Sequence, residues 1–209
     1  RSWKTFLGFV CAALSILIIS IALVGTDGMI QLIKLWLGYV GGIPGNFPDN
    51  MMNWRMLGFH LNRWFTPAVG GGIAIVGTLA TILAGVYLWL RPLDDHSPEY
   101  GVALLGVLAA TCAATWHSHF HMAMLLMPLL IYTSMQKTLP DRFLIIWTFF
   151  SSSVVGAVLL ISALITSVGF SLIPGFGGLL LGLSGLLLNI FLLVWSIRYI
   201  HRRRSILPA

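Results

Sequence analysis

The sequence has very little charge. Only 9% of its 209 residues are Asp, Glu, Lys or Arg, whereas 58% are apolar. No acidic or basic residue stands between Glu99 and Lys137. A soluble domain carries about a quarter charged residues, so a soluble fold is excluded. Because the apolar runs are continuous and do not alternate, the sequence predicts an all-α, polytopic transmembrane helical bundle rather than a β-barrel.

Cysteine is also scarce. Cys11 and Cys112 are the only two, and both lie inside apolar runs. This placement predicts two buried thiols and no disulfide.

The lengths of the apolar runs predict about six membrane crossings in a single transmembrane domain, residues 1–209. The crossings are expected at residues 5–25, 67–90, 100–115, 120–135, 143–166 and 179–200. Two shorter amphipathic stretches, 29–39 and 51–65, are too short to span. They predict two short helices in the membrane interface, within an outer loop over residues 26–66.

The distribution of Lys and Arg predicts the orientation. Nine of the twelve lie at the ends and in loops on one predicted side, and three (Lys34, Arg55 and Arg63) lie on the other. The positive-inside rule then places both termini in the cytoplasm of a multi-pass cell-membrane protein. Basic residues in short loops meet anionic membrane lipids, so the net charge of +6 does not indicate nucleic-acid binding.

Three of the six histidines, His117, His119 and His121, fall within five residues at a predicted turn between two crossings. Ionisable groups are costly at such a depth, which makes them a functional-site hypothesis. They suit anion binding, proton relay or metal ligation. Metal ligation is the weakest of the three because no carboxylate or cysteine lies nearby in the sequence, so no metal site is predicted. The alternative is that these histidines have no function beyond lying at the membrane interface, with their ring nitrogens in contact with water.

A second group of polar residues lies in the stretch 51–65. Asn53, Arg55, His60 and Arg63 stand there among aromatic and aliphatic residues. Arginines in an apolar helix near the outer surface suit a phosphate or pyrophosphate, which they hold bidentately. The alternative is that they reach the lipid headgroups.

Asp27 and Asp49 are the only acids on the predicted outer side. A reaction that needs a general base there would have to use one of them. The alternative is structural, because Thr26-Asp27-Gly28 is typical of a helix cap and Asp49 of a turn.

Three motifs together resemble the later half of the glycosyltransferase 87 family. They are Arg1-Ser2-Trp3-Lys4 leading to Gly25-Thr26-Asp27-Gly28, then Met52-Asn53-Trp54-Arg55-Met56-Leu57, and then the run from His117 to Met122 continuing into Leu125-Leu126-Met127-Pro128. The resemblance covers roughly residues 1 to 135. Members of this family are polytopic enzymes that move a sugar, typically mannose, from a polyprenyl-phosphate donor to a lipid-linked acceptor outside the cytoplasmic membrane.

The resemblance implies a division of roles. His117 and His119 are then expected to be catalytic, with Asn53, Arg55, His60, Arg63 and His121 binding substrate, and no cofactor is predicted. We expect His117, His119 and Arg55 to line an outer-face pocket, with His121 behind them. The match has departures. Met56 stands where the family has Gly, and no Asp follows the histidines. The family's catalytic Asp belongs to an earlier outer loop, so the chain is expected to be the later part of a longer polypeptide.

A different class of function stays open. The chain could be a non-catalytic integral subunit of a larger membrane complex that binds a haem or a pigment through a histidine. An axial histidine needs one ring nitrogen and a flat apolar slot.

Overall fold

The computed structural model describes residues 3–40, 51–150, 157, 161 and 178–206. Every regular element in these ranges is a helix, so the all-α prediction is confirmed for them. The chain divides into two compact units, Arg1–Asn46 and Phe47–Ala209. The two units are described separately below.

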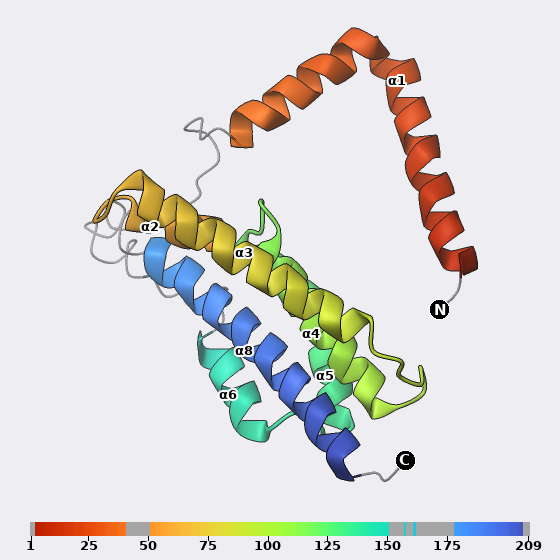
Figure 1. The fold of residues 1–209 in the computed structure, drawn as a ribbon, viewed down its shortest axis with the longest axis vertical. Helices are drawn as coiled ribbons and strands as arrows, with labels where there is room; N and C mark the ends of the chain where they lie inside the picture. Colours follow the sequence, from red (N-terminus) through yellow and green to blue (C-terminus); the bar gives the residue numbers. More distant parts are fainter. Residues whose placement is uncertain (1–2, 41–50, 151–156, 158–160, 162–177, 207–209) are drawn as a thin grey trace. The chain divides into compact units, whose positions relative to one another are not determined.

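The first unit is one long helix, α1 (Trp3–Val40), with a break at Gly25 (Figure 1). Gly25 has φ 73° and ψ 170°, a backbone conformation that side chains other than that of glycine rarely adopt. The sequence predicted a cap and turn at 26–28. The structure instead bends the chain at Gly25 and resumes the helix at once, so Asp27 lies in the first turn after the bend.

Within the described residues, three helices are long and apolar enough to cross a membrane: Val10–Lys34, Pro67–Trp89 and Leu179–Arg203. Two further apolar helices, Pro98–Ala114 and His121–Met135, are shorter. Of the predicted fifth crossing, 143–166, helix α6 (Asp141–Phe150) covers the start, and most of the rest lies outside the described residues. The chain is therefore a membrane protein whose described part holds three candidate spans, and the prediction of six crossings is not confirmed.

Helix α4 (Pro98–Ala114) is the centre of the second unit. It packs against α3 (Pro67–Trp89), α8 (Gly178–Ile206) and α5 (Met127–Met135) (Figure 1). Gly, Ala and Cys make up most of its buried positions. Small residues let transmembrane helices approach closely, so α4 can be covered on several sides at once. The exposed side of α3 stays apolar, as a lipid-facing surface would be.

The predicted crossing at 120–135 is broken in the structure. Phe120–Leu126 forms a 3-10 helix, η2, and α5 begins only at Met127. Pro128 stands in the first turn of α5. Proline has no N–H to donate and its ring clashes with the preceding turn of an α-helix, so the residues before it adopt the tighter helix.

Helix α2 (Trp54–Leu61) folds back along the first half of α3. At one end, the backbones of Gly58 and Gly70 touch. At the other, the Trp54 ring covers Gly77 and its Nε1–H donates to Thr81 Oγ1 at 2.8 Å. Its amphipathic pattern predicted a helix lying in the membrane interface. In the structure, contact with α3 accounts for that pattern.

The Gly58–Gly70 contact gives a sharp stability prediction. A side chain on Gly70 would meet the carbonyl oxygen of Gly58 and the amide oxygen of Asn62, whereas a side chain on Gly71 would meet nothing within 4 Å. Gly70→Ala is expected to destabilise the fold by roughly 1–3 kcal/mol through overpacking. Gly71→Ala is expected to be neutral or to stabilise by up to about 1 kcal/mol. Unfolding in mixed micelles measures both, and equal midpoints for the two variants would contradict the contact.

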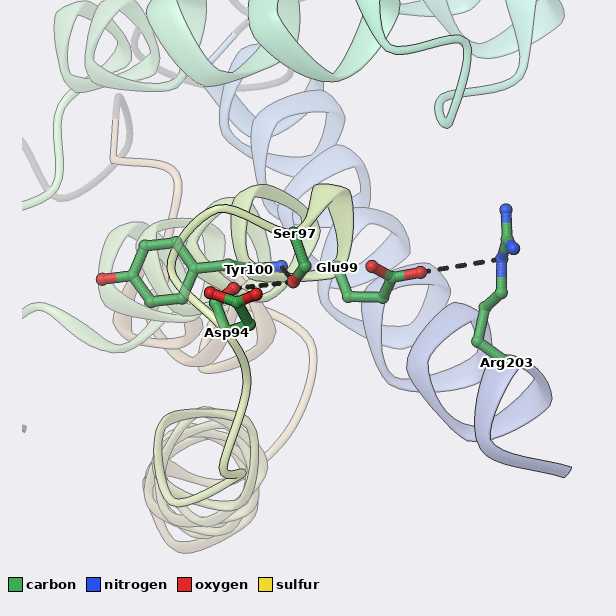
Figure 2. A network of polar contacts seen from close by, with 5 residues as sticks. All are labelled: Asp94, Ser97, Glu99, Tyr100 and Arg203. Carbon is green, nitrogen blue, oxygen red and sulfur yellow. Dashed lines mark hydrogen bonds and ion pairs between the residues drawn. The ribbon is translucent and has the colours of Figure 1, made fainter. Parts of the chain in front are cut away.

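Charged residues lie at the end of the second unit where α4 begins and α8 ends. Ser97 caps α4 by accepting from the Tyr100 N–H at 3.3 Å. The neighbouring Glu99 lies 3.7 Å from Arg203 of α8, which joins the start of one helix to the end of the other (Figure 2). The carboxylates and basic side chains of the 91–99 and 136–142 segments lie at this end. Its assignment to the cytoplasm stays a prediction.

The two cysteines differ. Both are free thiols, as predicted, and Cys112 is buried in α4. The prediction that Cys11 is buried is wrong, because it lies exposed on α1. An apolar run shows only that a residue belongs to a membrane helix, and not which of its faces is covered by protein.

Candidate functional site

Asn53 joins the two polar stretches that the sequence singled out. Its side chain is 1% exposed, and its Nδ2 donates to the carbonyl oxygens of Thr115 at 2.7 Å and Trp116 at 3.1 Å. Its Oδ1 accepts from the Met56 N–H at 2.9 Å and so caps α2. One amide therefore fixes the start of α2 against the turn that follows α4.

Backbone pairing reinforces this junction. The Met52 N–H donates to the Ser118 carbonyl at 2.7 Å, and Met51 and His119 form an isolated antiparallel bridge. Met51 also contacts α8, since a side chain on Gly182 would meet the Met51 carbonyl. We call residues 115–121 the histidine turn. It is held by α2 on one side, and its neighbour Met51 is held by the first turns of α8.

Arg55 lies over the histidine turn. Its guanidinium carbon is 4.5 Å from the centroid of the Trp116 ring, a cation–π contact. Partial burial lowers the pKa of Arg55, which stays far above neutrality. Burial also lowers the pKa of His117, and the positive charge of Arg55 lowers it further. Arg55 and His117 are therefore close enough to interact electrostatically.

His119 and His121 form a stacked pair. Their ring centroids are 5.7 Å apart with 15° between the planes. Burial lowers the pKa of His119, and the neighbouring His121 and His117 lower it further. His119 is therefore mainly neutral at pH 7 and gains its charge only in more acidic solution. The positive groups of this site therefore disfavour the protonation of His117 and His119.

The other two predicted substrate-binding residues lie further along α2. His60 is buried in its last turn, and Arg63 follows the helix, with its guanidinium 5.2 Å from the Phe59 ring. Arg55 and His60 are separated by five residues, about 7 Å along a helix. The structure thus brings Asn53 and Arg55 to the histidine turn and places His60 and Arg63 toward the Gly70 end.

Neither of the predicted outer acids belongs to the described part of the second unit. Asp27 lies in the first unit, and Asp49 lies outside the described residues. Within the described part of the second unit, the carboxylates are Asp94, Asp95, Glu99 and Asp141, at the opposite end. Nor do the described residues hold a cluster of three or more metal-binding side chains.

Two cavities in the described part of the second unit are lined by other residues than these histidines. One, about 10 Å³, lies between Met52, Ala123 and Asn189, and it has room for about one water molecule. The other lies along α8. The predicted outer-face pocket lined by His117, His119 and Arg55 is therefore not among them, although the three side chains do gather at one turn.

Sequence reasoning missed two parts of the site. Trp116 supplies the ring under Arg55, and the carbonyls of Thr115 and Trp116 hold Asn53. An aromatic residue directly before the first histidine was a usable signal, because arginine commonly stacks on aromatic rings. Nothing in the sequence pointed to the carbonyls.

The lowered pKa values predict how stability depends on pH. The folded chain takes up protons at His117 and His119 less readily than the unfolded chain. The free energy of unfolding is therefore expected to fall as the pH drops through the ordinary histidine pKa of about 6.5, and to be fully present above it. Unfolding midpoints between pH 8 and pH 5.5 measure this. His119→Gln should flatten the dependence and His96→Gln, an exposed loop residue, should not; equal slopes would contradict the electrostatic account.

A comparison of the chain with protein-family models, with curated proteins and with solved structures found no match.

Proposed function

We propose that this protein is a membrane glycosyltransferase that moves a mannose-like sugar from a polyprenyl-phosphate donor to a lipid-linked acceptor at the outer face of the cell membrane. The observation that carries the proposal is the meeting of Arg55 with the histidine turn. Asn53 ties the start of α2 to the carbonyls of residues 115 and 116, and this brings Arg55 over Trp116 and beside His117.

This arrangement suits a phosphate. Arg55 supplies a permanent positive charge and a planar fork of donors, held in one orientation by the Trp116 ring. His117 and His119 supply N–H donors that stay mainly neutral at pH 7 and gain charge when an anion binds nearby. A polar group of this kind, next to apolar helices, fits a ligand with a phosphate head and a long apolar chain.

The proposed chemistry follows from these groups. The acceptor hydroxyl oxygen forms a bond to the anomeric carbon and gives its proton to a general base other than Arg55, His117 and His119, and the bond from that carbon to the donor's phosphate oxygen breaks. Negative charge develops on the departing lipid phosphate, where preorganised donors are most effective. We assign Arg55, His117 and His119 to this phosphate, with His121 supporting His119 by stacking.

A pair of matched ligands tests the recognition step. Polyprenyl phosphate and the corresponding polyprenol differ only in the phosphate. At a concentration near 100 Kd, polyprenyl phosphate is expected to stabilise the folded protein by about 2.7 kcal/mol, and the alcohol clearly less. Reconstituted protein with a polyprenyl-phosphate sugar labelled in the sugar should then transfer the label to a lipid acceptor. Equal stabilisation by the two lipids would overturn the proposal.

The rival function is a non-catalytic subunit that binds a haem or a pigment through a histidine. Visible absorption of the purified protein decides between the two: a strong absorption band that His119→Ala removes would replace the transferase proposal with the rival.

A further inference from the structure

Asn189 is a polar side chain near the middle of the apolar span Leu179–Arg203 of α8. It is 2% exposed, and its side-chain Nδ2 is buried without a hydrogen-bond partner in the part of the chain that the structure describes. The interior of a membrane offers no bulk water, so an unpaired donor is costly at this depth. The amide of Asn189 therefore needs a partner where it stands.

The small cavity of about 10 Å³ lies directly beside this amide. Its wall includes Gly185 and Asn189 of α8, Met52, and Ala123 and Leu126 of η2. A volume of this size holds one water molecule and nothing larger. The cavity thus places room for a single small polar molecule next to a buried donor.

The wall also supplies an acceptor on the same helix. Gly185 and Asn189 are one helical turn apart, so they share one face of α8. In an α-helix, the carbonyl oxygen of residue 185 accepts from the backbone N–H of residue 189 and keeps a second lone pair. Glycine has no side chain to cover that oxygen. A molecule in the cavity can therefore accept from Asn189 and donate to Gly185.

We propose that this cavity binds one water molecule, which accepts from the Asn189 side-chain N–H and donates to the Gly185 carbonyl oxygen. The chemistry of the wall argues against other occupants. An N–H donor repels a metal cation, and an anion would have no opposite charge, because the lining residues are all uncharged. An apolar molecule would leave the amide unpaired.

The water would complete a contact behind the candidate site. Met52 directly precedes Asn53, and Ala123 follows the histidine turn. The cavity lies where α8 meets both segments. A water there stabilises the packing of α8 against the back of the histidine turn, and it does so whether or not the protein transfers sugar.

NMR of the purified full chain with ¹⁵N-labelled asparagine tests the proposal directly. A tightly bound water gives NOE and ROE cross-peaks of opposite sign with the N–H protons that it contacts. The Asn189 side-chain protons are expected to show such cross-peaks at the water frequency. Asn53 is the matched control: it is equally buried, but its Nδ2 donates to the carbonyls of Thr115 and Trp116, so its protons should show none. Missing cross-peaks at Asn189, or equal ones at Asn53, would overturn the proposal.

Two substitutions give an independent readout. Asn189→Leu removes the donor and fills the space of the amide and the water with apolar atoms, so its unfolding midpoint in mixed micelles should equal or exceed that of the unchanged protein. Asn189→Ala removes the donor and enlarges the cavity, so its midpoint should fall. An amide that donated directly to a protein carbonyl would give another order, because leucine would leave that carbonyl unpaired. A lower midpoint for Asn189→Leu than for Asn189→Ala would therefore contradict the bound water.

Discussion

Arg55→Ala is expected to lower the rate of sugar transfer by roughly 10²–10³, the loss seen when one preorganised donor to a developing negative charge is removed. The guanidinium is held 4.5 Å above the Trp116 ring and acts electrostatically on His117, so a phosphate at the histidine turn would meet it directly. Measurement of kcat and KM with a polyprenyl-phosphate sugar separates the contribution of Arg55 to substrate binding from its contribution to the transition state. A fall in kcat with KM nearly unchanged would place the effect in the transition state.

A charge-conserving variant sharpens this result. Arg55→Lys keeps the positive charge but loses the planar fork and its stack on Trp116, so it should recover only part of the rate. Arg142→Ala, at the opposite end of the unit, is the control and should retain the rate within about twofold, as is typical of surface substitutions away from a site. The transferase proposal fails if Arg55→Ala transfers sugar as fast as the unchanged protein.

The helices were predictable where one local rule decides them. Residues 67–90 were predicted as a crossing, and α3 occupies Pro67–Trp89, because proline fits the first helical turn and the run behind it is purely apolar. The break at Pro128 follows from the same chemistry of proline. It was missed because hydropathy alone treats residues 120–135 as one continuous run.

Helix α2 shows that an amphipathic pattern predicts an apolar face but does not identify the surface that covers it. The stretch 51–65 has the amphipathic pattern of an interfacial helix. Such a helix is stabilised when its apolar face is buried, either in a membrane surface or against a neighbouring helix. The choice is made by Gly58 and Gly70, whose missing side chains let α2 and α3 touch. Two glycines twelve residues apart become informative only once the chain is known to turn back between them.

The candidate site was predictable in its residue types but not in its architecture. Histidines clustered at a membrane turn and arginines in an apolar helix are each visible in the sequence, because ionisable groups are rare there. Their junction depends on Asn53, which reaches across 62 residues to Thr115 and 63 to Trp116. Sequence reasoning assigned Asn53 to substrate binding. The structure engages both its donor and its acceptor ends within the chain.

Asn53→Leu is therefore expected to be the most destabilising substitution in the second unit, by roughly 3–5 kcal/mol. The cap of α2 contributes about 1 kcal/mol, and each of the two partly buried hydrogen bonds to the carbonyls of Thr115 and Trp116 contributes about 1–2 kcal/mol. Asn53 is 1% exposed, so water cannot easily replace its amide. Unfolding in mixed micelles measures the loss. A cost below about 1 kcal/mol would mean that the junction is not held by this side chain.

Asn53→Asp distinguishes the two roles of this side chain, which are to cap α2 and to donate to the carbonyls of Thr115 and Trp116. The carboxylate can still accept from the Met56 N–H, and it places negative charge where the amide nitrogen donated to two carbonyl oxygens. A buried carboxylate beside acceptors favours its protonated form, so this variant should become more stable as the pH falls toward 5, opposite to the unchanged protein. If the amide only capped α2, Asn53→Asp would be nearly as stable as the unchanged protein at every pH. If the free energy of unfolding of Asn53→Asp instead rises as the pH falls, the hydrogen bonds from Asn53 to the histidine turn are what fixes this junction. Arg55 is then held over Trp116 because of these hydrogen bonds.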